Sequence, residues 1–151
     1  MPRVSVVGTI AEPTALKVFG HDIAISRVAA NKVGQRVEIE GYLCYNDKVG
    51  AYLQAVKYEP TDAKDSNLCV VTGKVVSVLK ERKHQVHQRT VGIILQQSAS
   101  RKSRVLITVV GAHIQELDVG NLSAGQELSV RGYINYHRRG LHVNYKEKAM
   151  E

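Results

Sequence analysis

Three short segments in the second half of the chain are rich in arginine and lysine. They read K-E-R-K-H-Q-V-H-Q-R at 80–89, S-A-S-R-K-S-R at 98–104 and Y-H-R-R-G at 136–140. Guanidinium and ammonium groups pair with phosphates, so their concentration in surface segments favours a polyanionic ligand, nucleic acid first. The candidate phosphate-binding residues are Lys80, Arg82, Lys83, Arg89, Arg101, Lys102, Arg104, Arg138 and Arg139.

Flat side chains on which nucleobases could stack come mainly from tyrosine, because the chain has seven Tyr, one Phe and no Trp. Residues 127–136 alternate in polarity as a half-buried strand does, which directs Tyr133 outward. Tyr136 has the inward phase but stands at the entrance to the 136–140 segment, where a bend can release it. We predict Tyr133 and Tyr136 as stacking residues, with ordinary packing or a subunit contact as the alternative for each.

The excess positive charge belongs entirely to the second half. Residues 1–66 hold 8 basic and 8 acidic side chains, whereas residues 67–151 hold 13 and 6, which accounts for the net charge of +7. We therefore expect the first half to bind phosphates poorly and to serve assembly or a partner contact. A basic surface that only keeps the protein soluble is the alternative explanation of the charge.

No arrangement of residues in the sequence indicates catalysis or a bound metal. His84 and His87 form H-x-x-H without a third ligand at metal spacing, and neither Cys44 nor Cys69 belongs to a C-x-x-C pair. The G-x-x-x-x-G-K-[ST] phosphate loop and the G-x-S-x-G nucleophile turn are both absent. We expect a protein that is not an enzyme and uses no cofactor or metal. The cysteine count, the lack of a long apolar run and the lack of a signal peptide predict a cytoplasmic protein without membrane contact.

The elements that must position these residues are short β-prone runs, and helix signals are weak. The second half, which is longer between its matching glycines, also has room for a short helix near 112–118. The predicted strands are 4–10, 21–25, 36–43, 51–58, 68–79, 89–97, 103–111, 127–136 and 141–145.

The two halves repeat one another. Residues 34–45 align with 125–136 through the shared pattern G-Q-x-[VL]-x-[IV]-x-G-Y-[LI]-x-Y. About five short strands per copy predict an all-β chain of two tandem OB-fold five-stranded barrels, the first of them reduced. The predicted domains are a small neutral one at 1–60, a linker at 61–67 and a basic one at 68–151. A single ten-stranded β-sandwich is the competing topology.

Three stretches of the second half resemble the bacterial single-stranded DNA-binding protein family and its relative, primosomal replication protein B. They are C-V-V-T-G-K-V at 69–75, R-V-L-I-T-V-V-G followed by A-H-I-Q-E-L at 104–117, and L-S-A-G-Q-E-L-S-V-R-G-Y-I at 122–134. The similarity covers about 69–147. The chain departs from the family in having no Trp, a tandem arrangement, and K-E-K-A-M-E at its end in place of an acidic tail, which makes it more similar to the primosomal relative or to a phage or mobile-element variant.

The resemblance implies a largely sequence-independent single-stranded DNA-binding protein that acts in DNA replication, recombination or transfer. An OB-fold binds nucleic acid on strands 2 and 3 and on the loops after strands 1 and 4, where the basic segments would lie. Two alternatives stay open: a replication or primosome accessory that uses its barrels for protein contacts, and an RNA-binding protein. The expected partners are single-stranded DNA or RNA, replication proteins and a second copy, since a homodimer would bring four OB-folds together.

Overall fold

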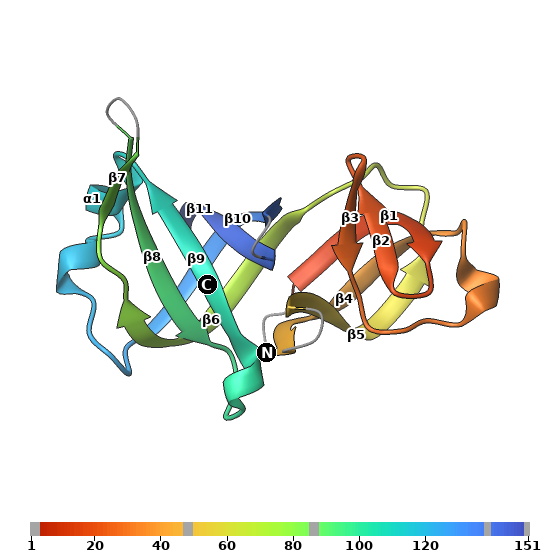
Figure 1. Cartoon of the computed structure of the whole chain (residues 1–151), viewed down its shortest axis with the longest axis horizontal. Helices are drawn as coiled ribbons and strands as arrows, with labels where there is room; N and C mark the ends of the chain where they lie inside the picture. The colour runs from red at the N-terminus through yellow and green to blue at the C-terminus, as the bar shows by residue number, and fades with distance from the viewer. Residues whose placement is uncertain (1–3, 47–49, 85–87, 138–139, 150–151) are drawn as a thin grey trace.

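The computed structural model describes residues 4–46, 50–84, 88–137 and 140–149. The chain is mostly β-strand and forms two sheets, which appear as two lobes side by side (Figure 1). Short helical turns connect some of the strands. The first lobe contains β1 (Val4–Glu12), β2 (Ala15–Val18), β3 (His21–Ala24), the 3-10 turn η1 (Ala30–Lys32), β4 (Arg36–Asn46) and β5 (Gly50–Pro60). The second contains β6 (Leu68–Val78), β7 (Arg82–His84), β8 (Gln88–Gln96), η2 (Arg101–Ser103), β9 (Arg104–Val110), α1 (His113–Glu116), η3 (Val119–Asn121), β10 (Glu127–His137) and β11 (Gly140–Lys148).

The strands of the second sheet are hydrogen-bonded in a ring. The order runs β6-β10-β11-β9-β8, and β8 also pairs with β6, which returns the order to its first strand. All of these pairings are antiparallel except that of β11 with β9, which is parallel. The short strand β7 extends beyond the ring as a ribbon on β8.

The first sheet has the order β3-β2-β1-β4-β5. Its two edges meet through a parallel bridge between Ile25, just after β3, and Leu53 on β5. The order of strands around the first sheet therefore corresponds to the order around the second.

The repeated G-Q dipeptide has the same conformation and hydrogen bonds in both halves. Gly34 has a φ of 91° and Gly125 a φ of 89°, a region that favours glycine. The Gly34 N–H donates to the Ile10 carbonyl and the Gly125 N–H to the Val75 carbonyl, both at 2.7 Å. The sequence repeat thus marks one turn used twice, at the entrances of β4 and β10.

All nine predicted runs are strands, and the predicted helix is present as α1. Two strands were not predicted, β2 and β7, and both are shorter than five residues. The prediction that 80–89 is a single loop is wrong, because Arg82–His84 pairs with β8.

Every second side chain along the strands points inward, and these side chains form the core. In β10 the side chains of Leu128, Val130 and Ile134 are at most 7% exposed, whereas Tyr133 is 40% exposed. Tyr145 on β11 is also buried, on the same face as the buried Val143. The outward direction of Tyr133 is therefore confirmed.

Residues 65–67, in the predicted linker, are hydrogen-bonded to both sheets. Ser66 exchanges backbone hydrogen bonds of 2.9 and 3.1 Å with Val7 of β1. Asn67 accepts a 2.9 Å bond from the Ile134 N–H and donates from Nδ2 to the Ile134 carbonyl at 2.8 Å. The connection between the lobes is consequently anchored on β1 and on β10.

Asp65 holds the same connection to the first sheet through its carboxylate. Its Oδ1 lies 2.8 Å from Nη2 of Arg36, and its Oδ2 accepts a 2.9 Å bond from the Phe19 N–H. The bond from Phe19, followed by that from Arg36, lowers the pKa of the Asp65 carboxyl below its ordinary value.

Candidate nucleic-acid interface

The outer face of β8 and β9 carries a strip of apolar side chains. Leu79, just after β6, donates its N–H to the Gly92 carbonyl at 2.7 Å and is 45% exposed. A Cβ built on Gly92 would come within 3.0 Å of both Leu79 Cδ1 and Leu106 Cδ1, so these leucines meet over the glycine. Ile94, two residues along β8, is half-buried on the same face. We call Leu79, Gly92, Ile94 and Leu106 the apolar strip.

One end of the strip is bordered by Arg101, Lys102 and Arg104, which we call the lower basic group. All three are exposed. Arg104 Nε donates to Gln96 Oε1 at 3.0 Å, which orients the guanidinium beside the end of β8. None of the three forms an ion pair with an acidic side chain in the described part of the chain. Their charges are therefore available to an anion.

Serine hydroxyls hold the turn that carries the lower basic group. Ser103 Oγ is buried, accepts from the Ser98 N–H at 3.0 Å and donates to the Ser100 carbonyl at 2.6 Å. Ser100 Oγ accepts from the Lys102 N–H at 3.2 Å. The serines of S-A-S-R-K-S thus have a structural role as internal caps of η2.

The other end of the strip is bordered by Lys80, Arg82 and Arg89, the upper basic group. All three are exposed, and β7 places Arg82 opposite Thr90. Arg89 Nη2 lies 2.7 Å from Glu81 Oε1, so part of this charge is neutralised within the group. The upper basic group is thus weaker toward anions than the lower one.

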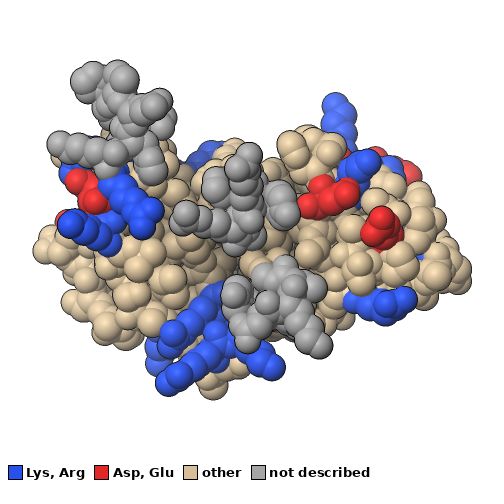
Figure 2. Space-filling view, viewed as in Figure 1, with Lys and Arg blue, Asp and Glu red and all other residues tan. Residues whose placement is uncertain are grey.

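Figure 2 shows Lys and Arg gathered at two ends of this lobe with uncharged surface between them. The pairing of β8 with β9 runs from Gln96–Arg104 to Thr90–Val110. Six residues at roughly 3.3 Å each separate the two groups by about 20 Å. That length matches about six nucleotides of a stacked strand at roughly 3.4 Å per nucleotide.

The predicted stacking residue Tyr133 lies elsewhere. Its register partners are Leu68 on β6 and Asn144 on β11, so it belongs to the outer face of β10, not to that of β8 and β9. Lys146 Nζ lies 5.7 Å from the centre of its ring. Four other predicted positions lie outside the described part of the chain. They are the side chains of Lys83 and Tyr136 and the whole of Arg138 and Arg139.

The leucines of the strip were missed in the sequence. A signal for Leu106 is present, because in R-V-L-I-T-V-V at 104–110 it stands among the outward residues, between polar Arg104 and Thr108, where a strand with one solvated face would carry a polar side chain. Leu106, on the phase opposite to the buried Val105 and Ile107, is the residue that this pattern identifies.

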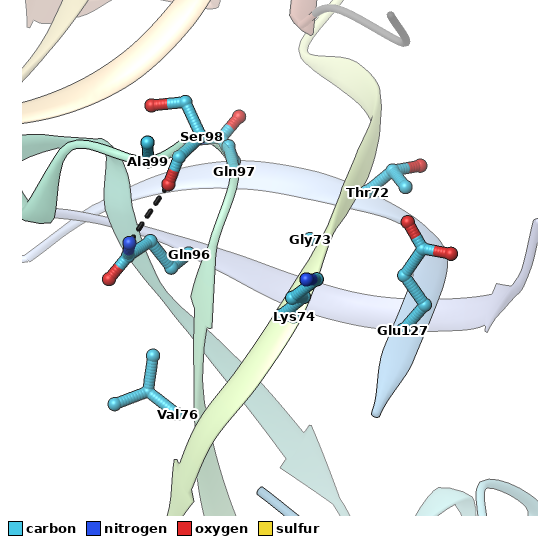
Figure 3. Close-up of a pocket in the computed structure, with 9 residues that line it drawn as sticks. All are labelled: Thr72, Gly73, Lys74, Val76, Gln96, Gln97, Ser98, Ala99 and Glu127. Carbon is cyan, nitrogen blue, oxygen red and sulfur yellow. Dashed lines mark hydrogen bonds between the residues drawn. The ribbon is translucent and has the colours of Figure 1, made fainter. Parts of the chain in front are cut away.

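A hollow of about 540 Å³ lies beside the strip, between the beginning of β10 and the turn after β8. Figure 3 shows Lys74 and Glu127 on its border, with Gln96 Nε2 donating to the Ser98 carbonyl at 2.9 Å. Lys74 and Glu127 are register partners, so opposite charges stand together there. This hollow therefore lacks the positive excess that a phosphate would need.

In the described part of the chain, no three His, Cys, Asp or Glu side chains come together in a group that could hold a metal ion. No helix among the described residues is long and apolar enough to span a bilayer.

No protein-family model matches the chain. No curated protein matches it either. Among solved structures, the chain is similar to the single-stranded DNA-binding protein from Thermus aquaticus, with 15% sequence identity. The wild-type structure gives a TM-score of 0.69 and the match covers 100% of this chain and 94% of that one. A deletion mutant of the same protein gives a TM-score of 0.70, with coverage of 100% and 95%. The chain has the OB-fold of bacterial single-stranded DNA-binding proteins.

A third similar structure is the SSB domain of a Synechococcus protein, with 16% identity, a TM-score of 0.48, and coverage of 58% of this chain and 99% of that one. At identities near 15%, similarity to these proteins establishes the fold, whereas function depends on the chemistry of the site.

Proposed function

We propose that this chain is a non-enzymatic single-stranded DNA-binding protein. The observation that carries the proposal is the apolar strip over Gly92, open to solvent and bordered at both ends by basic side chains. Single-strand binding requires positive charge along the phosphates and apolar surface against the bases, and this face supplies both. The proteins from Thermus aquaticus that share the fold are described as single-stranded DNA-binding proteins.

The proposed architecture is two tandem OB-fold barrels with the first reduced, at 1–60 and 68–151, joined by residues 61–67. Two observations support it: the corresponding strand order of the two sheets and the matched turns at Gly34 and Gly125. Each barrel would hide strand edges that such short strands otherwise expose.

The proposed binding residues are those of the two basic groups. The predicted residues that lie outside the described part of the chain belong to the same proposal. Leu79, Ile94 and Leu106 are added as base contacts. Tyr133, on the outer face of β10, is proposed as a separate base contact for a DNA strand that continues around the barrel. The complete proposed set of predicted residues is Lys80, Arg82, Lys83, Arg89, Arg101, Lys102, Arg104, Tyr133, Tyr136, Arg138 and Arg139.

Binding of this kind is largely independent of base sequence, because phosphates and apolar contacts carry little sequence information. It would suit a protein that covers single strands exposed in DNA replication, recombination or transfer. The neutral first lobe is proposed to serve assembly, and a homodimer would bring four OB-folds together.

The test is fluorescence anisotropy of a labelled 30-nucleotide single strand at two salt concentrations, with duplex DNA and a matched RNA strand as competitors. We expect binding that prefers the single strand and weakens steeply with salt. Equal binding to duplex would mean that the charge is a general basic surface. Preference for RNA would assign the same face to an RNA strand.

A further inference from the structure

A crevice lies between the two lobes at the lower end of the apolar strip. Its volume is about 390 Å³, within the range of roughly 300–1,000 Å³ typical of ligand sites. The first lobe contributes Leu43 and Cys44 at the end of β4 and Ala51 on β5. The second contributes Ile94 and Leu106 of the strip, so the crevice and the strip are continuous.

The inside of the crevice is apolar and its border is positive. Leu43 and Leu141 are 2% and 6% exposed, which makes them fixed walls from the two lobes. Arg101 and Arg104 stand on the border, and no acidic side chain is among the described residues that line it. A ligand suited to this site is flat and apolar on its faces and carries a negative charge at one end.

The two sides of the crevice are held together by a direct hydrogen bond. Gln97 Nε2 donates to the Leu43 carbonyl and to the Ser103 carbonyl, each at 3.0 Å. The first bond reaches the wall contributed by β4, and the second reaches the turn that carries Arg101. The opening is therefore preformed and needs little ordering when it is filled.

We propose that this crevice receives one nucleobase of a bound single strand, with the adjoining phosphate on Arg101 and Arg104. The inference rests on the proposed function and adds to it a site built from both lobes. Ser77, which also lines the crevice, offers a hydroxyl to the polar edge of the base. A strand that follows the apolar strip would turn one base inward where the strip meets the first lobe.

Cys44 provides a reporter inside the crevice. It is half-buried and lines the opening, whereas Cys69, the other cysteine of the chain, is 3% exposed. Burial raises the pKa of both thiols, and it raises that of Cys69 to about 12. A disulfide reagent at alkaline pH should therefore modify Cys44 and leave Cys69 unreacted, because the thiolate is the attacking species. Cys69→Ala checks that assignment.

The experiment measures the modification rate of Cys44 with no DNA, with a 30-nucleotide thymidine strand and with an abasic strand of the same length. We expect the thymidine strand to slow the reaction about tenfold, since exchange depends on access to the sulfur, and the abasic strand to leave it unchanged. The abasic strand has the same phosphates, so with both strands at saturating concentrations the difference isolates the contribution of the bases.

A filling variant tests the same site without the reagent. Ala51→Leu places extra carbon atoms in the crevice. Ala55→Leu is its control, because Ala55 lies on the same strand and is also partly buried against the core but does not line the crevice. We expect Ala51→Leu to weaken binding of the thymidine strand about tenfold, or about 1.4 kcal/mol. Affinity for the abasic strand should not change in either variant.

The outcomes separate the inference from the proposed function. No binding of the thymidine strand by anisotropy would overturn both. Binding that leaves Cys44 fully reactive would overturn the crevice site alone, as would equal protection by the abasic strand. Protection that needs no DNA and rises with protein concentration would mean that a second copy covers the crevice. If Ala51→Leu fails to fold, the rates measured on the unmodified chain still decide the question.

Discussion

The side-chain amide of Gln97 donates a 3.0 Å hydrogen bond to the carbonyl of Leu43, and this bond joins the two lobes. Gln97 follows β8 and Leu43 lies on β4, so residues far apart in sequence meet here. The contact fixes the first lobe beside the lower basic group. It makes the junction between the lobes part of the candidate interface.

We expect Gln97→Ala to lower the free energy of unfolding by about 1–2 kcal/mol, because two hydrogen bonds to carbonyls are lost and each is worth about 0.5–1.5 kcal/mol net. The measurement is urea denaturation. Gln54→Ala is the control, since the exposed side chain of Gln54 bonds, among the described residues, only to the adjacent Ala55 carbonyl at 3.5 Å. Equal losses in the two variants would mean that the bond to Leu43 contributes nothing.

Removing the two arginines of the lower basic group should weaken single-strand binding and its dependence on salt. In the double variant Arg101→Ala and Arg104→Ala, two phosphate contacts are lost, so the slope of log affinity against log salt should decrease in magnitude by about 1.4. A salt titration by anisotropy measures it. Lys17→Ala with Lys64→Ala removes the same charge from the first lobe and the linker and should leave the slope unchanged. An equal change there would indicate a nonspecific effect of net charge.

Truncation of Leu79 should weaken DNA binding more than it lowers the free energy of unfolding. Leu79→Ala removes apolar surface that a strand would cover, which we expect to weaken binding about tenfold at roughly 0.8 kcal/mol per buried methylene. Val33→Ala is the control for binding, because Val33 is also 45% exposed but lies in the first lobe. Leu95→Ala is the control for stability, since Leu95 is fully buried and its truncation should cost about 2–5 kcal/mol. Unchanged affinity in Leu79→Ala would remove the strip from the interface.

Asp65 makes the anchoring of the linker depend on pH. Its folded pKa is lower than the ordinary value of 3.8, mainly through the Phe19 N–H and then Arg36. The carboxylate therefore stabilises the fold above pH 3.8, and this stabilisation is lost as pH falls through the lower folded value.

At pH 7 we expect Asp65→Asn to be less stable by about 0.5–1 kcal/mol, a small effect because solvent screens the pair. The difference from the unmodified chain should shrink below about pH 4 as the Asp65 carboxylate is protonated. Urea denaturation at several pH values measures it, with Asp62→Asn as a control at an exposed neighbour. A difference that stays constant with pH would contradict the role of the charge.

Local patterns in the sequence were sufficient for most of the fold. Alternation along 127–136 correctly separated buried Val130 from exposed Tyr133, because the two faces of a strand have opposite surroundings. The repeat correctly identified Gly34 and Gly125 as equivalent, since a turn with positive φ imposes the same residue wherever it recurs. Strands β2 and β7 were missed because three or four residues contain too little alternation to detect.

The sequence by itself determined which residues are basic, where nine of the strands run and that the pattern at 34–45 recurs at 125–136. Only the tertiary structure decided which of these residues share a surface. It brought Leu79 and Leu106 together over Gly92, separated Tyr133 from them, paired Arg89 with Glu81 and left Arg101 unpaired among the described residues. The crevice between Leu43 and Leu106 was likewise invisible in the sequence, because contacts between distant segments depend on how the sheets close and pack.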